Sequence, residues 1–278
     1  MSATLTSMKR LLALCLAALV LVGCATNPVT GRRQFIMVSE SEAIAASKQA
    51  YAAEITPLAK QGKVDNDPAM TRRVHEITSR LIAQAIKYRP ETAKWEWSVK
   101  VIDDPQTVNA FCMAGGKMAI YSGLITKLNA TDDEIANVMG HEIGHAISNH
   151  TAEKMSVAMA SQLGAAVVGA AAGSRYGGAA ASGAAAAATL AVQLPNSRTA
   201  ESEADRIGIE LAARAGYDPN AAVTLWQKMA KAGGSRQPEF LSTHPAPETR
   251  IRELQALAPQ MMPYYLDKSP RPVYPLRS

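Results

Sequence analysis

Cysteine is scarce in this sequence of 278 residues, and so is an excess of charge of either sign. The three cysteines cannot build a disulfide scaffold, and they form no CxxC pair or zinc-finger spacing. The formal net charge of +5 falls to +3 when Lys9 and Arg10 are left out, which is too weakly basic to indicate a nucleic-acid partner. With 47% hydrophobic residues the chain is not disordered, and it is long enough for one large domain or two small ones.

A long apolar run is lacking as well. The run at residues 11–22 is too short to cross a bilayer as a permanent helix, but it follows two basic residues and has the length of a secretory h-region. Residues 21–24, Leu-Val-Gly-Cys, resemble a bacterial lipobox, which predicts a lipoprotein signal peptide at 1–23 and a lipidated Cys24. Because Ala25 is not a known retention signal, the expected location is the periplasmic face of the outer membrane. An ordinary signal peptide with a chance cysteine is the alternative, and Met8 is an alternative start.

Apolar periodicity and capping residues predict an α+β fold that is mainly helical. Alternating apolar residues from Trp95 to Val101 indicate a strand, and the paired Gly115 and Gly116 indicate a tight hairpin turn. Thr131 begins a capping box ahead of an apolar-periodic helix. The expected helices are 39–60, 68–89, 131–150, 197–214, 219–231 and 247–257, and the expected strands are 95–101, 109–113 and 117–121.

His141, Glu142 and His145 form an HExxH motif inside the helix that Thr131 begins. Residues four apart lie on one helix face, so both imidazoles can reach a single cation while Glu142 projects beside them toward a water molecule. Zinc suits neutral imidazole nitrogen, and Glu142 would act as the general base of peptide hydrolysis. His150 lies nine residues after His141 and would share this site only if the helix broke.

A third zinc ligand is expected in Glu201, which opens a predicted helix 56 residues after His145. Asp205, one turn later, would face the same site and accept the free N–H of a ligand imidazole. Taken alone, these two acidic residues also fit a solvated helix face. Behind an HExxH motif, a metal site is the better interpretation.

His141 to His145, together with Glu201, Ala204 and Asp205, resemble metallopeptidase family forty-eight, a family of gluzincins. The resemblance covers nearly all of the chain after Cys24 and is strongest to periplasmic lipoprotein members. It implies a gluzincin metallopeptidase domain with a small β-sheet beside the HExxH helix, and one Zn²⁺ per chain. The implied zinc ligands are His141, His145 and Glu201, with Glu142 as the general base. Matching flanking pieces are residues 27–31, 109–111, 115–116, 122–124, 242–245 and 250–251.

The resemblance also implies a role for His244. The corresponding histidine of similar members can occupy the fourth zinc position and hold the enzyme inactive. Two alternatives stay open for His244 in this sequence. It is a loop histidine before a proline in one, and a hydrogen-bond donor to the transition state in the other.

Asn109 and Ala110 lie on a strand that the resemblance makes an edge strand beside the cleft. An exposed edge can bind an extended peptide by strand addition, which favours unfolded or misassembled chains as substrates. A purely structural hairpin is the alternative. Between Leu163 and Ala191, 20 of 29 residues are Ala or Gly. The resemblance places an active-site lid between the HExxH helix and the third ligand, so residues 163–194 are expected to form a mobile lid or loop, or a hairpin at the membrane surface. An Ala-rich packing helix is the alternative.

The expected order along the chain is a signal peptide at 1–23, a lipid-anchored tether at 24–38, a metallopeptidase domain at 39–260 and a proline-rich tail at 261–278. The predicted function is a zinc metalloendopeptidase, attached to the membrane by its lipid, that hydrolyses damaged, unfolded or misassembled envelope proteins. The alternative is a zinc-binding lipoprotein that acts as an assembly chaperone for outer-membrane proteins. Glu142 argues against it, because zinc binding alone does not need that carboxylate.

Overall fold

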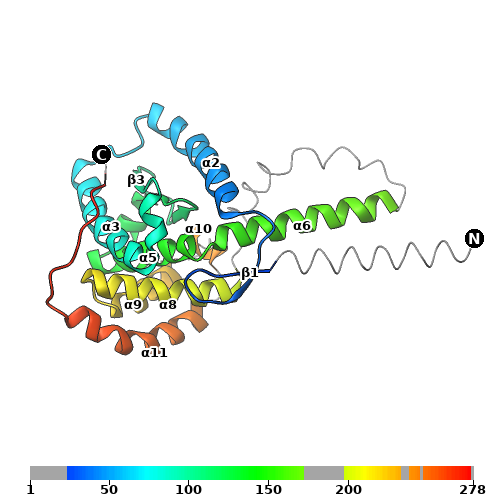
Figure 1. Ribbon diagram of the computed structural model, residues 1–278. Coiled ribbons are helices and arrows are strands. Elements are labelled where there is room, and N and C mark those ends of the chain that lie inside the picture. The colour runs from blue at the N-terminus through cyan, green and yellow to red at the C-terminus, as the bar shows by residue number, and fades with distance from the viewer. Residues whose placement is uncertain (1–23, 172–196, 233–237, 245–246, 277–278) are drawn as a thin grey trace, which may run out of the picture.

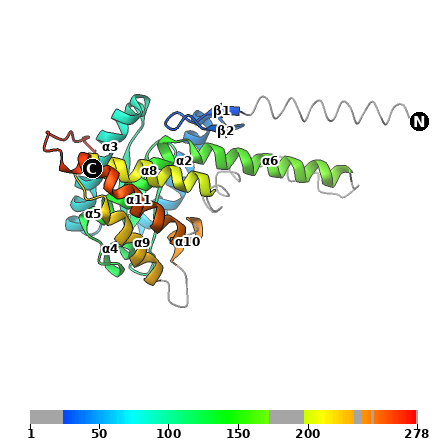
Figure 2. The same cartoon turned by 90° about the horizontal axis from the view of Figure 1, so that it is seen from below.

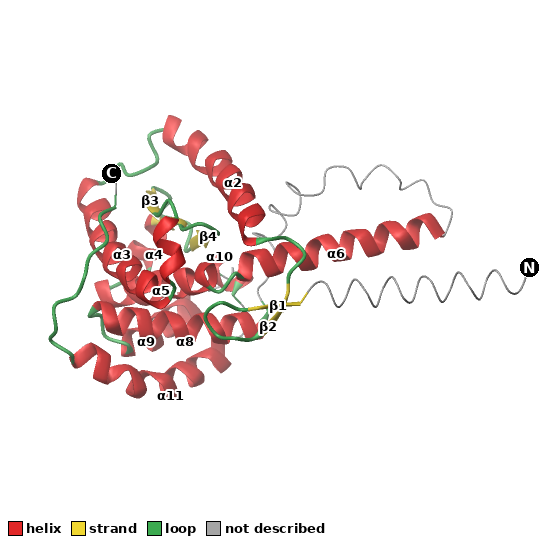
Figure 3. Ribbon diagram, in the orientation of Figure 1, coloured by secondary structure: helices red, strands yellow, loops and turns green. Residues whose placement is uncertain are grey.

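The computed structural model describes residues 24–171, 197–232, 238–244 and 247–276 (Figure 1). Helices dominate and the strands form two small sheets, which confirms the predicted mainly helical α+β class (Figure 3). The described helices are α2 (Glu40–Lys60), α3 (Pro68–Tyr88), α4 (Ser122–Lys127), α5 (Asp132–Ile147), α6 (His150–Ala171), α8 (Arg198–Ala215), α9 (Asn220–Ala232), α10 (Glu239–Thr243) and α11 (Pro247–Leu266), with a 3-10 turn η1 (Pro90–Lys94). The described strands are β1 (Cys24–Thr26), β2 (Arg33–Phe35), β3 (Ser98–Ile102), β4 (Ala110–Met113) and β5 (Lys117–Tyr121).

Side-chain caps begin α2, α3 and α5 where the sequence indicated. Ser39 and Thr131 accept a hydrogen bond from the backbone N–H of Glu42 and Glu134, whose carboxylates accept one in return, so both form capping boxes. Asp67 caps α3 by accepting from two backbone N–H groups. These bonds determine where α5 starts and therefore which face its HExxH motif presents.

The three-stranded sheet has the order β3-β5-β4, with β3 parallel and β4 antiparallel to β5. Gly115 and Gly116 form the β4–β5 turn at φ values of +82° and +79°, which other residues rarely adopt. The predicted hairpin is thus confirmed. Strand β4 lies at the edge of this sheet and contacts α5, so its outer side faces the HExxH helix.

Helices α5 and α8 lie side by side in the middle of the molecule (Figure 2). Small residues permit their close approach. A Cβ on Gly208 would lie 2.5 Å from the backbone N of His141, and one on Gly144 would lie 3.1 Å from the carbonyl oxygen of Ala204. This contact brings Glu201, in the first turn of α8, to the two histidines of α5.

The apolar core lies between α5, α3 and the three-stranded sheet; α9 packs on α5, and α11 packs on α8 and α9 (Figure 2). Its side chains come from the apolar faces that the sequence periodicity indicated. Because the core packs against α5 on most of its circumference, the helix has little freedom to move. Among the largest fully buried side chains are Ile77, Leu81, Met118, Ile120, Ile135, Met139 and Ile143.

The helix expected at 131–150 is in fact two helices. Helix α5 ends at Ile147, and α6 begins at His150. Between them Asn149 takes a left-handed backbone conformation with φ of +57°. The expectation of one continuous helix is wrong, and so is the resulting position of His150 on the face opposite His141.

The break is held by contacts that are distant in sequence. The carbonyl oxygen of Ser148 accepts hydrogen bonds from Asn27 Nδ2 at 3.2 Å and from Gln34 Nε2 at 2.9 Å. Both donors belong to residues 24–38, here called the N-terminal hairpin, in which β1 pairs with β2. A carbonyl at the end of a helix lacks its helical partner, and these side chains supply one.

Helix α11 extends further than the expected 247–257 and continues to Leu266, beyond the expected domain end at 260. Pro259 and Pro263 lie inside it, and each removes one helical hydrogen bond. Both prolines are on the exposed side, while the opposite side packs into the core, so burial outweighs the loss of those bonds. The core-facing residues are Leu254, Ala258 and Met261.

Residues 24–38, expected as a tether, form the N-terminal hairpin, which packs on α6 (Figure 2). The signal peptide expected at 1–23 lies outside the described residues. Most of the Ala/Gly-rich segment at 163–194 also lies outside them, and its first residues continue α6 to Ala171. Within the described ranges, no helix is both long enough and apolar enough to cross a membrane.

Candidate metal centre and active site

Four potential metal ligands converge where α5, α8 and α10 meet. They are His141 and His145 of α5, Glu201 of α8 and His244 at the end of α10. All four are buried, and one ligand atom of each lies within 4.8 Å of the others. The two Nε2 atoms of His141 and His145 are 3.0 Å apart, and Glu201 Oε1 lies 3.3 Å from His145 Nε2. The structure thus brings the three predicted ligands together with His244.

Asp205 lies 3.0 Å from His141, measured from Oδ1 to Nδ1, as the spacing of the two acidic residues on α8 predicted. Arg250 of α11 donates from Nε to Asp205 Oδ2 at 2.7 Å, and its other nitrogens donate to Asp205 Oδ1 and to Glu201 Oε2. The Arg250 guanidinium also lies 3.7 Å from the centre of the Trp226 ring. Burial alone would raise the pKa of Asp205, but Arg250 lowers it below its ordinary range. Asp205 is therefore a carboxylate that can accept the Nδ1–H of His141, and Arg250 Nη2 lies 3.2 Å from the same ring nitrogen.

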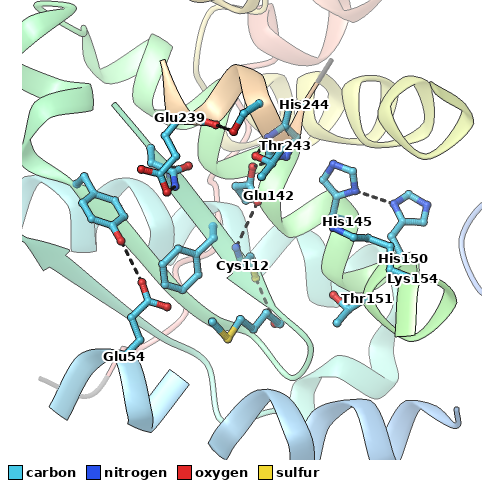
Figure 4. A pocket seen from close by; sticks show the side chains of 16 residues that line it. Glu54, Cys112, Glu142, His145, His150, Thr151, Lys154, Glu239, Thr243 and His244 are labelled. Atoms are coloured by element: carbon cyan, nitrogen blue, oxygen red, sulfur yellow. Dashed lines mark hydrogen bonds and ion pairs between the residues drawn. The ribbon is translucent and has the colours of Figure 1, made fainter. Parts of the chain in front are cut away.

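His145 has a corresponding partner in His150. The two Nδ1 atoms are 2.8 Å apart (Figure 4). His150 Nε2 lies 3.0 Å from Glu203 Oε2. Burial raises the pKa of Glu203, but hydrogen bonds from His150, Thr30 and Arg32 outweigh it and lower the pKa to about 2. A carboxylate only accepts, so His150 donates from Nε2, and its neutral ring then accepts at Nδ1. His145 Nδ1 must then donate, which leaves a lone pair on the Nε2 that faces the cluster.

This distribution of protons fits a bound cation. His141 and His145 present ring lone pairs to each other at 3.0 Å, and Glu201 Oε1 is buried with no hydrogen-bond partner among the described residues. Burial and the neighbouring His141 lower the pKa of His145, which keeps its ring neutral. Such groups repel one another unless a cation lies between them. Two neutral imidazoles and a carboxylate are a donor set of catalytic zinc sites, so these residues fit Zn²⁺.

Glu142 lies beside the cluster and is only 4% exposed. Its Oε2 accepts a hydrogen bond from the backbone N–H of Cys112 on β4 at 3.3 Å, and its Oε1 lies 3.4 Å from His244 Nε2 (Figure 4). Burial, and then the charge of Glu201, raise the pKa of Glu142 well above its ordinary value. A raised pKa suits a carboxylate that acts as a general base near neutral pH.

His244 presents its Nε2 to the cluster. Its Nδ1 lies 3.0 Å from the carbonyl oxygen of Phe240, which can only accept, so the proton is on Nδ1. The ring stacks on that of Phe240 with 4.1 Å between their centres. Burial lowers the pKa of His244, and the ring stays neutral. In this tautomer Nε2 is an acceptor, which fits a fourth metal ligand better than a donor to the transition state.

A cavity of about 280 Å³ opens in front of Glu142, His145 and His244 (Figure 4). Residues 109–113, from Asn109 to the end of β4, line one wall of it. The predicted edge-strand residues Asn109 and Ala110 are therefore in the cavity wall. An extended chain laid along β4 would pass directly in front of Glu142.

Lys154 of α6 also lines this cavity. Burial lowers the pKa of Lys154 to about 8. The charges of Glu201 and Glu142 raise this pKa, but they offset only part of the effect of burial. The lysine thus adds one cation to a cavity whose other charged groups are mostly acidic. It was not among the predicted site residues, and no local signal in the sequence indicates it.

Arg250 and His150 are the other two contact residues that sequence reasoning missed. Arg250 entered only as part of a flanking motif, and its partners lie 45 and 49 residues away. For His150 a signal exists. Asn149 tolerates the left-handed conformation that often ends a helix, so Ser148-Asn149 could have indicated that the HExxH helix stops there.

Comparison with known proteins agrees with this geometry. The sequence model of peptidase family M48 matches residues 68–258. The chain belongs to this family. It is 38% identical over 158 residues to the mitochondrial metalloendopeptidase OMA1 of Arabidopsis thaliana, which covers 57% of this chain and 31% of that relative. It is 32% identical over 247 residues to the mitochondrial metalloendopeptidase OMA1 of Bos taurus. This match covers 85% of this chain and 46% of that relative.

This M48 chain is also 31% identical over 214 residues to the beta-barrel assembly-enhancing protease of Escherichia coli. This match covers 73% of this chain and 42% of that relative. It spans less than half the length of each of these three relatives. The match confirms the predicted family, its class of zinc metallopeptidase and its zinc cofactor. The four-ligand cluster lies entirely within the matched residues.

Proposed function

We propose that this M48 chain is a zinc endopeptidase that cleaves damaged, unfolded or misassembled envelope proteins. In this proposal His141, His145 and Glu201 hold the zinc, and Glu142 is the general base. The observation that carries it is the convergence of two ring lone pairs and a buried carboxylate beside a cavity that Glu142 also lines. The relatives named metalloendopeptidase support the same type of reaction.

Each residue then has a defined task. Zinc held at this site supplies Lewis acidity, which polarises a carbonyl oxygen and makes water a stronger acid. Glu142 takes a proton from the attacking water and passes it to the leaving amine. The Cys112 N–H keeps the Glu142 carboxylate at the cavity wall. Asp205, itself held by Arg250, orients His141.

The substrate class follows from the edge strand. The Cys112 N–H points away from the sheet toward Glu142, and Asn109 and Ala110 lie on the same wall. A peptide paired with β4 would be recognised mainly through its backbone, so it must be extended. This supports unfolded or misassembled chains, because a folded substrate keeps its backbone groups in its own structure.

The proposed location is the periplasmic face of the outer membrane, through a lipid on Cys24. The lipobox supports it, and so does similarity to a bacterial protease named for beta-barrel assembly. Strand β1 starts at Cys24, so a lipid there would hold the N-terminal hairpin at the membrane surface. We expect Cys24→Ser to lose palmitate labelling and to move from the membrane fraction to the soluble fraction. Full labelling of Cys24→Ser would contradict the proposed anchor.

The reaction is tested with purified, zinc-loaded protein on unfolded casein. General-base catalysis contributes about 10² to 10⁴-fold, so Glu142→Gln should lose at least about 10²-fold in kcat while binding zinc as before. Glu91→Gln, on an exposed residue of η1, is the matched control and should keep its activity. Full activity of Glu142→Gln would contradict the mechanism, and full rescue of a deletion phenotype by that variant would favour the chaperone alternative.

A further inference from the structure

The N-terminal hairpin is joined to the metal centre by a chain of charged and polar groups. Arg32 donates from Nε to both carboxylate oxygens of Glu203 at 3.0 Å, and from its two terminal nitrogens to Glu153 at 2.9 and 2.6 Å. Glu203 accepts from His150, and His150 contacts the ligand His145. A single arginine of the hairpin therefore reaches α6 and α8 and lies three contacts from a zinc ligand.

The direction of the hydrogen bonds along this chain is determined at its outer end. Arg32 has no acceptor, so it can only donate, and Glu203 as a carboxylate can only accept. His150 must then donate from Nε2; with its ring neutral it accepts at Nδ1, and His145 donates from Nδ1. In this way Glu203 selects the tautomer of a neutral His150, and His150 in turn selects the tautomer of His145. The final result is a lone pair on His145 Nε2, which is the form that can bind a metal.

The same hairpin also produces the backbone geometry that this chain of contacts requires. Asn27 and Gln34 donate to Ser148 O at the end of α5, and the Oγ of Ser156 on α6 accepts from the backbone N–H groups of Met37 and Val38. These bonds hold α6 in the direction that turns His150 toward the site. If α5 continued as one helix, His150 would point away from His141 and His145.

We propose that Arg32, Glu203 and His150 form a positioning relay through which the N-terminal hairpin sets the tautomer and orientation of the ligand His145. These residues touch neither substrate nor metal, and they act through His145. The proposal deepens the proposed function, because it rests on His145 being a zinc ligand. It makes the segment that follows the lipidation site part of the catalytic domain rather than a passive linker.

The first test is the affinity for zinc of the full chain, measured by competition with a chromophoric chelator. Loss of an outer partner of a metal-bound histidine costs about 10 to 100-fold in affinity. We expect losses of this size for His150→Ala and Glu203→Gln, and a smaller loss for Arg32→Met, which is one step further away. The visible spectrum of the Co²⁺-substituted protein should change in the same order, because it reports the geometry of the ligands.

Two matched controls separate the relay from general surface effects. Arg33→Met removes the neighbouring arginine of the same hairpin, which is exposed, and Glu91→Gln removes an exposed carboxylate. Both should bind zinc as the unmodified protein does. Wild-type zinc affinity and an unchanged Co²⁺ spectrum in His150→Ala and Glu203→Gln would overturn the proposal.

A double-mutant cycle makes the test independent of folding defects. If Glu203 acts only through His150, Glu203→Gln combined with His150→Ala should lose no more affinity than His150→Ala alone. Additive losses would overturn the relay, even if each variant is less stable. Because zinc binding is measured without substrate, an inactive but zinc-binding wild-type protein would contradict the proposed function and leave this test intact.

Discussion

Each histidine of the metal centre has one ring nitrogen engaged by a neighbour, and this decides what the other nitrogen can do. In all three rings the neighbour of Nδ1 can accept its proton, which leaves the Nε2 lone pair on the side of the cluster. The arrangement favours metal binding, because neutral imidazole is the ligand form. The pairs are His141 with Asp205, His145 with His150, and His244 with the carbonyl of Phe240.

His244 is the potential ligand whose removal should increase activity. It occupies the fourth position of the cluster and lies 3.4 Å from Glu142, on the wall that a substrate must approach. We expect His244→Ala to raise basal casein hydrolysis several-fold, because a coordination position opens for water or substrate. His75→Ala, on a partly buried histidine of α3 whose Nε2 lies 3.2 Å from the carbonyl oxygen of Val99, is the control. A fall in activity of His244→Ala would instead support the transition-state donor.

Some contacts of the site could be predicted from spacing, and others could not. His141, His145 and the pair Glu201 and Asp205 lie one helical turn apart, so local geometry is enough to group them. His150 could not be assigned in this way, because its position depends on a helix break held by residues 114 and 121 positions earlier. Spacing within one helix says nothing about such contacts.

Between elements, the decisive contact is the crossing of α5 and α8. The two helices approach so closely that even a methyl group does not fit at Gly140 or Gly208. Helix propensity alone would favour Ala over Gly there by about 1 kcal/mol. Glycine at these positions therefore reflects packing between helices, and this packing sets the distance from Glu201 to the histidines.

Gly208→Ala should be destabilising and should also weaken the metal centre. The new Cβ would lie 2.5 Å from the His141 backbone N, so the helices must separate. Overpacking of this kind costs about 1 to 3 kcal/mol, which exceeds the gain in helix propensity. We expect a lower free energy of unfolding in urea and weaker zinc binding. Arg206→Ala, on the exposed side of α8, is the control, and an unchanged zinc affinity in Gly208→Ala would contradict the role of the crossing.

Most helices could be predicted because their ends depend on local chemistry. Ser39, Asp67 and Thr131 accept from N–H groups two or three residues ahead, so the sequence alone shows these starts. The end of α11 could not be predicted, because its two prolines indicate a stop. Packing of the helix on α8 and α9 keeps it helical to Leu266. The errors therefore fall where tertiary contacts override local preference.

For the molecule as a whole, the N-terminal hairpin joins parts of the chain that are far apart. It contacts the end of α5, the start of α6 and the first turns of α8, and it begins at the residue proposed to carry the lipid. Membrane attachment and metal binding would then share one structural unit. A force or a contact that displaced the hairpin would act on His150 before it reached the zinc ligands.

This attachment should make stability depend on pH through Glu203. Its pKa in the folded protein is about 2, against an ordinary value of 4.5, so ionised Glu203 stabilises the fold above about pH 4.5. That contribution is lost as the pH falls from about 4.5 toward 2, because protonation then favours the unfolded chain.

In urea unfolding of the metal-free protein, the stability difference between wild type and Glu203→Gln should shrink over this range. Glu91→Gln, with no ion pair in the described structure, is the control for exposed carboxylates. A difference that stayed constant from neutral pH to pH 3, which is about the middle of that range, would mean that Glu203 does not hold the hairpin through its charge.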